Sequence, residues 1–189
     1  MLVTFFLLSI PYFSLAQKLE YPIYRWEEIL NASPDTIYGI SFAKKRQTEL
    51  PVELSKFINL RYLNLNKNKL QFLPEFISEL KGLEVFQAEK NDFEIFPLAL
   101  TDLPQLKIIN LHQNKITAIP ESIQNCSNLE ELDLSDNDIE KLPDAVFELK
   151  TLKVIDLSNI RMGPRFQKEI TSRRSDIKWI LDPPCDCMD

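Results

Sequence analysis

An apolar residue recurs every 23 residues through the middle of the chain, and the same order of apolar and polar positions follows each one. In the copy that begins at Leu60, the side chains of Leu63 and Leu65 fall on one side of an extended segment. Tyr62 and Asn64 fall on the other side. This alternation predicts a short β-strand at the start of each copy. Successive copies begin at Leu60, Leu83, Leu106, Leu129 and Leu152.

The repeated unit covers residues 37–160, as five full copies and one truncated copy. A weaker first copy, IYGISFAKKRQTELPVELSKFIN, starts at Ile37, and the truncated last copy is LKVIDLSNI. One copy alone cannot bury its apolar face, whereas stacked copies share a continuous core. We therefore expect six parallel strands, about 4.8 Å apart, in an elongated solenoid.

Two further columns fit such a solenoid. In the four middle copies, asparagine recurs just after the strand, where a sharp turn leaves backbone groups unpaired in a tight interior, and an amide side chain can both donate and accept hydrogen bonds. The first and last copies have Lys45 and Ile160 at this position. Proline recurs on the return path, where no backbone N–H is needed. The predicted asparagine ladder consists of Asn68, Asn91, Asn114 and Asn137.

This pattern resembles the leucine-rich-repeat family in its short form, L-x-x-L-x-L-x-x-N-x-L-x-x-L-P, over roughly Ile37 to Ile160. That form is common in bacterial secreted proteins and in Ras-associated scaffold proteins. The resemblance implies an α/β repeat solenoid, a short horseshoe with parallel strands on its concave face. It also implies protein ligands most often, and glycan or lipid ligands less often.

The segments that flank the repeats are expected to cap the open ends of the solenoid. In residues 17–36 we expect a short helix around Tyr24 to Leu30, ended by Pro34, that covers the first repeat. In residues 161–189 we expect a helix that begins at Pro164 and a strand from Ile177 to Leu181. Two caps favour a complete small protein over a fragment.

The first sixteen residues, MLVTFFLLSIPYFSLA, read as a secretory signal peptide, with an apolar run followed by a small-x-small pattern ahead of Gln17. No Lys or Arg precedes the apolar run, which leaves a buried N-terminal strand or a misassigned start codon as alternatives. No later apolar run approaches the length of a transmembrane helix. We expect a secreted, extracellular or periplasmic protein, and a cytoplasmic one if residues 1–16 are not a signal.

Composition excludes several kinds of chemistry. A net charge of −6 argues against a nucleic-acid partner, and 3 glycines leave little material for phosphate-binding loops. His112 is the single histidine, so that a multi-histidine metal site is excluded. We find no nucleophile elbow or calcium loop and expect no enzyme, no cofactor and no metal.

The cysteines suggest little chemistry. Cys126 occupies a column otherwise filled by Phe and Leu, and we expect it to be a small core residue. Cys185 and Cys187 lie in the tail PPCDCMD, where a tight disulfide, a redox pair, an incomplete metal site and intermolecular bridges all remain open.

The strand positions that point away from the core form the expected ligand-binding face. Lysines at one end of this concave face give way to carboxylates at the other, and an apolar strip of Tyr62, Val85 and Ile108 runs beside them. The candidate residues are Tyr62, Asn64, Asn66, Lys67, Val85, Gln87, Glu89, Lys90, Ile108, Asn110, His112, Gln113, Glu131, Asp133, Asp136 and Asp156.

These observations predict a non-catalytic protein-binding module that reads a partner with a complementary division of charge. The apolar strip would supply desolvated contacts, while the charges would set orientation and association rate. Solubilising surface charge is the plainer interpretation of the lysines. An intracellular scaffold or signalling adaptor is the second candidate function, and a redox or metal role of Cys185 and Cys187 is a weaker one.

Overall fold

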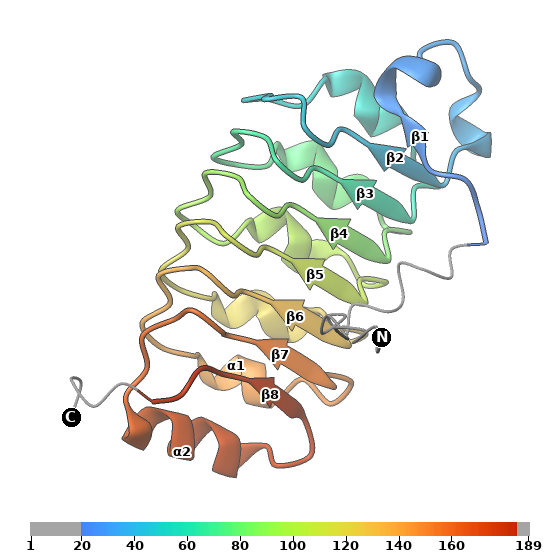
Figure 1. The fold of residues 1–189 in the computed structure, drawn as a ribbon. Coiled ribbons are helices and arrows are strands. Elements are labelled where there is room, and N and C mark those ends of the chain that lie inside the picture. The colour runs from blue at the N-terminus through green and yellow to red at the C-terminus, as the bar shows by residue number, and fades with distance from the viewer. Residues whose placement is uncertain (1–19, 185–189) are drawn as a thin grey trace, which may run out of the picture.

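In the computed structural model, which describes residues 20–184, the repeats stack into one parallel sheet (Figure 1). Within these residues the sheet has eight strands in chain order. The repeats supply β2 to β7, β8 follows them as the sequence predicted, and β1 was not predicted. The strands are β1 (Tyr24–Arg25), β2 (Gly39–Ser41), β3 (Tyr62–Asn64), β4 (Val85–Gln87), β5 (Ile108–Asn110), β6 (Glu131–Asp133), β7 (Val154–Asp156) and β8 (Lys178–Ile180).

Neighbouring strands pair with the register of the 23-residue repeat. Tyr62 lies opposite Val85, Val85 opposite Ile108, and Ile108 opposite Glu131. Since successive side chains of a strand point to opposite faces, this register stacks equivalent residues into columns on both faces of the sheet. The solenoid predicted from the sequence is confirmed.

Return segments carry the chain from each strand to the next on the other side of the sheet (Figure 1). A proline precedes each short return helix. The carbonyl of Pro51, for example, accepts a hydrogen bond of 3.1 Å from the N–H of Leu54. The return helices are η4 (Val52–Lys56), η5 (Glu75–Glu79), η6 (Leu98–Asp102) and η7 (Glu121–Asn125), all 3-10 helices, and the α-helical turn α1 (Asp144–Phe147).

The main core fills the space between the sheet and the return helices. Leu63 of β3 and Ile77 of η5 are both fully buried in it. Cys126 is also fully buried, and its thiol donates a hydrogen bond of 3.5 Å to the carbonyl of Leu100. Burial raises the pKa of this thiol to about 12. The prediction that Cys126 is a core residue is confirmed.

Buried asparagine amides hold the turns that follow β3, β4, β5 and β6. The Asn114 amide donates hydrogen bonds to the carbonyls of Ala88, at 3.1 Å, and Leu111, at 2.9 Å. Its Oδ1 accepts from the N–H of Phe93 at 3.2 Å. The amides of Asn68, Asn91 and Asn137 make the corresponding bonds. These are the hydrogen bonds that the repeat pattern predicts for a ladder joining successive copies.

The residue before each ladder position has a left-handed backbone. Lys67 has a φ of 61° and Lys90 a φ of 57°, although neither is a glycine. Left-handed backbone is strained for residues with a Cβ atom, and β-branched side chains tolerate it least. Within residues 20–184, the non-glycine residues with positive φ are Lys44, Arg46, Lys67, Lys90, Gln113, Asp136 and Asn159.

The N-terminal end differs from the predicted helix of Tyr24 to Leu30. Tyr24–Arg25 forms β1, paired with β2, and only Trp26–Glu28 is helical, as the 3-10 helix η2. The Trp26 ring stacks on Phe42 at a centroid distance of 5.0 Å, and Ile29 is buried. Leu30, expected to close the core, is 62% exposed. Pro34 begins a second 3-10 helix, η3 (Pro34–Thr36), because proline suits the first position of a helix.

At the other end, helix α2 (Pro164–Arg173) begins at Pro164, and β8 follows it. Ile170 of α2 is buried against the core. Arg174, just after α2, donates from Nη1 to the carbonyls of Phe147 and Leu149 at 3.1 and 3.0 Å. These bonds tie the end of the last return segment to the C-terminal elements.

Three expectations fall on residues outside the described part of the chain. Residues 1–16, Cys185 and Cys187 are not among residues 20–184, so the signal peptide and the fate of the two cysteines remain sequence-based. Within residues 20–184, every helix is too short or too polar to cross a membrane.

Replacing Asn114 by alanine should lower the free energy of unfolding by about 1–3 kcal/mol, because the Phe93 N–H and two carbonyls would lose their partner in a buried turn. Urea unfolding followed by circular dichroism measures the change. Asn125→Ala, at an exposed position on η7, is the control and should leave stability nearly unchanged. Equal stability of the two variants would contradict the ladder assignment.

Candidate functional site

The predicted ligand-binding residues lie on the sheet face opposite the return helices, which we call the concave face (Figure 1). The strand register brings them together in parallel columns, each contributing one residue per repeat. The columns differ sharply in exposure, and this divides the predicted residues into buried, bridging and open positions.

The apolar strip of Tyr62, Val85 and Ile108 was expected to be exposed, but the structure buries it. These side chains are only 5%, 3% and 1% exposed, and they form a small cluster separate from the main core. Tyr21, which precedes the repeats, packs against this cluster, and burial raises the Tyr21 pKa to about 12. The strip is therefore packed within the concave face and is not exposed as the sequence suggested.

Polar side chains bridge the neighbouring columns. The Tyr62 hydroxyl donates to Oε1 of Gln87 at 2.8 Å and accepts from the Asn64 amide at 3.3 Å. Asn66 reaches across to the next repeat, where its Oδ1 accepts from the N–H of Glu89 at 2.8 Å. These contacts order the floor of the face between β3 and β4.

One predicted column has a structural role. Oδ1 of Asn64 accepts from the backbone N–H two residues later, at 2.9 Å, and Asn110 does the same for the N–H of His112. Asp133 and Asp156 accept from the N–H groups of serines two residues on. Strands β3, β5, β6 and β7 thus each end with a side chain that satisfies its own backbone, whereas at β4 the N–H of Glu89 bonds to Asn66 of the preceding repeat. These residues shape the face as well as line it.

The basic end of the face is open to solvent. Lys67 and Lys90 lie in adjacent repeats with side chains 43% and 46% exposed, and Gln113 continues their column in the next repeat. Glu89 lies between the lysines, with its Oε1 3.7 Å from Lys67 Nζ and 3.8 Å from Lys90 Nζ. Because one carboxylate serves two ammonium groups, the cluster keeps an excess positive charge.

The acidic end is largely desolvated. Burial, with a smaller contribution from Glu130, raises the pKa of Glu131 to about 7. Burial and the nearby Asp156 carboxylate raise the pKa of Asp133 to about 6, against the opposing hydrogen bonds from Ser135. Within residues 20–184, Oε2 of Glu131 is buried and accepts no hydrogen bond. These carboxylates therefore hold protons more readily than carboxylates in water.

His112 is joined to the acidic end of the face through a series of hydrogen-bonding groups. Its Nδ1 lies 2.8 Å from Oγ of Ser135, and Ser135 Oγ donates to Oδ1 of Asp133 at 2.6 Å. The other ring nitrogen, Nε2, lies 4.0 Å from Oδ2 of Asp136.

This series of hydrogen bonds does not activate Ser135 as a nucleophile. In a serine hydrolase the histidine takes the serine proton, and a carboxylate orients the other ring nitrogen through a hydrogen bond. The Ser135 proton instead points at Asp133, so that Ser135 Oγ accepts from His112 Nδ1. The 4.0 Å separation from Asp136 exceeds hydrogen-bond length. Ser135 is also only 4% exposed. The arrangement orients His112 rather than preparing a nucleophile.

No group of three or more His, Cys, Asp or Glu residues within residues 20–184 is arranged to hold a metal ion.

The sequence did not predict that Tyr21 belongs to this face. Ser135 was expected on the face, in the column of Asn66, Glu89 and His112, but its bonds to His112 and Asp133 were not predicted. Ser135 carries a usable signal, because Asp133-Leu134-Ser135 recurs 23 residues later as Asp156-Leu157-Ser158, with the same side-chain hydrogen bond. Tyr21 carries none, since it lies outside the repeats and belongs to no column.

Two family models described as leucine-rich repeat match the chain, one over residues 94–139 and the other over residues 59–80. A curated mouse protein, leucine-rich repeat and calponin homology domain-containing protein 1, is 36% identical over 70 residues. That match covers 37% of this chain and 10% of the mouse protein.

Solved structures show the same fold. A leucine-rich-repeat protein of Leptospira interrogans has a TM-score of 0.68 and 26% identity over 78% of this chain and 38% of its own. The internalin InlF of Listeria monocytogenes has a TM-score of 0.63 and 18% identity over 78% of this chain and 44% of its own. The ectodomain of the Arabidopsis thaliana receptor kinase GASSHO1/SCHENGEN3, solved in complex with Casparian strip integrity factor 2, has a TM-score of 0.57. It is 29% identical over 72% of this chain and 17% of its own. This chain thus spans less than half the length of each of these proteins.

Replacing Glu131 by glutamine should flatten the dependence of stability on pH. The folded-state pKa of about 7 lies above the ordinary value of 4.5, so the folded state binds the proton more tightly than the unfolded chain. The resulting stability is fully present below pH 4.5 and is lost as the pH rises toward 7.

Urea unfolding at several pH values between 4.5 and 7 tests this. The control is Glu140→Gln, which removes an exposed carboxylate and should keep the slope of the wild type. An unchanged slope in the Glu131→Gln variant would show that this carboxyl ionises normally in the folded protein.

Proposed function

Because the chain is a leucine-rich-repeat protein, we propose that it is a non-catalytic protein-binding module and that its concave face binds the partner. The observation that carries this proposal is the division of charge along a rigid sheet. Lys67 and Lys90 stand exposed at one end, and the half-buried Asp136 and Asp156 line the other, with Asp133 buried beside Asp156.

The partner that fits this face carries acidic groups opposite the lysines and basic groups opposite the carboxylates. Charges arranged in this way orient an approaching partner and speed its association. Because Tyr62, Val85 and Ile108 are buried, the partner would contact the two more open columns instead. One column contains Lys67, Lys90 and Gln113, and the other contains Glu89 and His112. Protein–protein contacts of this polar kind depend on salt, because exposed charges are screened within about 10 Å at 0.1 M ionic strength.

Relatives favour a protein or peptide ligand over a small molecule. The Arabidopsis thaliana ectodomain was solved in complex with Casparian strip integrity factor 2. From that complex we carry over to this chain only the proposal that a surface of the repeats binds a protein partner. Glycan and lipid ligands rank behind proteins.

We propose that the protein acts outside the cytoplasm, as a secreted or cell-envelope protein. The support is the sequence of residues 1–16, with its apolar run and small-x-small pattern. The second candidate is an intracellular scaffold or signalling adaptor, which applies if residues 1–16 remain on the mature chain. A redox or metal role of Cys185 and Cys187 is the weaker alternative, tested by counting free thiols in the native protein.

The double variant Lys67→Asp, Lys90→Asp should lose the partner that the wild type recovers in a pull-down from its native source, quantified by mass spectrometry. Affinity for that partner should fall about tenfold or more, and its salt dependence should flatten. Aspartate is the appropriate substitute because Asp136 adopts the same left-handed backbone in this column.

The matched control is Lys56→Asp, Lys150→Asp, which makes the same change in net charge at exposed positions on the return side of the solenoid. It should retain the partner. If the concave double variant binds as tightly as this control, the lysine end of the face has no part in recognition.

N-terminal sequencing of the protein isolated from its native cells should begin at Gln17, because signal peptidase cleaves after small-x-small. Recovery of that species outside the cytoplasm would agree with export. A mature chain that keeps residues 1–16 and stays in the cytoplasm would instead favour the scaffold function.

A further inference from the structure

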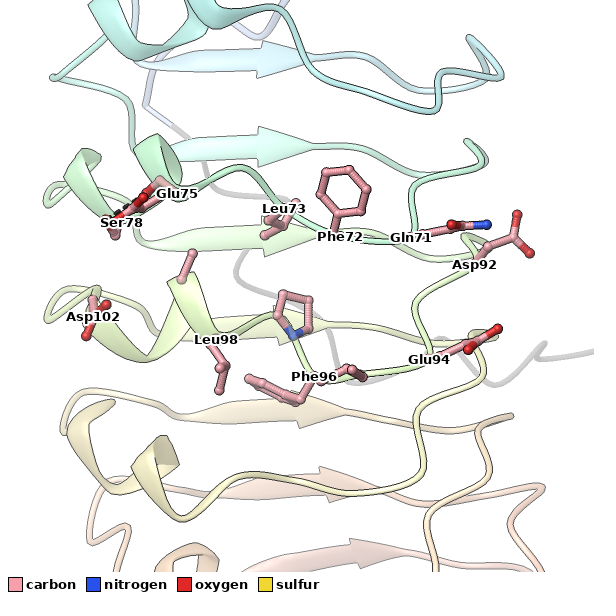
Figure 2. Close-up of a pocket in the computed structure, with 13 residues that line it drawn as sticks. Gln71, Phe72, Leu73, Glu75, Ser78, Asp92, Glu94, Phe96, Leu98 and Asp102 are labelled. Carbon is pink, nitrogen blue, oxygen red and sulfur yellow. Dashed lines mark hydrogen bonds between the residues drawn. The ribbon is translucent and has the colours of Figure 1, made fainter.

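A groove of about 620 Å³ lies on the flank of the solenoid, beside return helices η5 and η6 and away from the concave face (Figure 2). Its apolar part consists of Phe72, Ile95 and Leu98, which are 60%, 75% and 57% exposed. Phe96 and Pro97 are buried beneath them. Neighbouring apolar side chains this exposed are unusual on a soluble protein unless something binds them.

The repeat scaffold does not require these apolar residues. Apart from Val52, the columns that contain them hold charged residues or alanine in other copies, where the same backbone forms. The column of Phe72 and Ile95 reads Glu49, Phe72, Ile95, Ala118 and Lys141, and that of Leu98 reads Val52, Glu75, Leu98, Glu121 and Asp144. Folding therefore does not require apolar residues at these positions, and their presence at the groove needs another explanation.

Carboxylates stand at both ends of the apolar strip. Figure 2 shows Glu75 and Asp102 at one end and Asp92 and Glu94 at the other. Asp92 is paired with Lys115, at 2.7 Å. Within residues 20–184, by contrast, Glu75, Glu94 and Asp102 form no ion pair.

The lining of the groove thus combines an apolar centre with an excess of carboxylates over the two cations at its rim, which are Lys115, beside Asp92 and Glu94, and Lys81, which donates to the Asp102 carbonyl at 3.2 Å. None of its residues, all within the described part of the chain, is Lys or Arg. A cationic ligand with an apolar centre matches both features, whereas an anionic lipid surface would be repelled.

We propose that this groove is a second binding site, which takes a segment of a partner protein with an apolar side chain flanked on both sides by Lys or Arg. The apolar side chain packs among Phe72, Ile95 and Leu98, and the flanking cations meet the carboxylates at the two ends. The site is separate from the concave face and does not depend on the function proposed for that face.

The proposal is tested with a phage library that displays random twelve-residue peptides. Phage are selected for binding to the full chain, after those that bind the Ile95→Lys variant have been removed. Lysine is chosen because Lys141 occupies the same column, so the fold accepts it. Enriched peptides should carry an apolar residue between basic ones. A synthetic peptide of the consensus should bind the Ile95→Lys variant at least about tenfold more weakly than the wild type in fluorescence polarisation.

Two matched pairs separate the apolar from the charged contribution. Ala118→Lys places the same lysine in the same column one repeat further on, outside this groove, and should leave the consensus peptide bound. Glu94→Gln should weaken binding and reduce its salt dependence, whereas Glu140→Gln, in the column of Glu94 but two repeats away, should change neither.

Three results would overturn the proposal. The first is a selection with no enrichment, or one whose peptides carry acidic flanks. The second is equal binding by the Ile95→Lys and Ala118→Lys variants. The third is a dimer in sedimentation velocity that dissociates in the Ile95→Lys variant, which would show that a second copy of the chain covers the groove. Unchanged capture of the concave-face partner by the Ile95→Lys variant would confirm that the two sites are independent.

Discussion

The buried asparagine amide found in each of the four middle repeats is the interaction on which the solenoid depends. Each strand pairs through only about three residues, and the chain must then turn sharply enough to bring the next strand alongside. Asn114 shows how the turn is held. Its amide donates to one carbonyl in its own repeat and one in the preceding repeat, and its Oδ1 accepts from an N–H of the preceding return segment. Without that bonding, the turns would leave unpaired backbone groups in the core.

The sequence predicted the repeats well because the 23-residue spacing and the physics of burial point to the same structure. Alternation gave the strand at Tyr62, and the columns gave the buried roles of Cys126 and Asn114. The ends were harder to predict. Tyr24 and Arg25 form β1 because β2 offers an unpaired edge, and this long-range pairing outweighs the local helical pattern.

The binding face was predictable in its placement and less so in its exposure. Periodicity tells which side of the sheet Val85 faces, but whether a side chain is covered depends on residues outside the repeat, as Tyr21 shows. The sequence pattern did not predict the flanking groove, for a related reason. A search for repetition treats Phe72 and Ile95 as ordinary variation, whereas their departure from Glu49 and Lys141 in the same column is the informative feature.

The left-handed turns limit which chemical repertoire the concave face can display. The turn column holds Lys67, Lys90, Gln113, Asp136 and Asn159, all unbranched at Cβ. Valine, isoleucine and threonine would be strained there, because two substituents on Cβ crowd the backbone at positive φ. The surface charge of such a sheet can therefore change sign when one flexible polar side chain in the turn column is replaced by another. New branched apolar contacts have to arise on other columns, which makes charge the easiest property of this surface to alter.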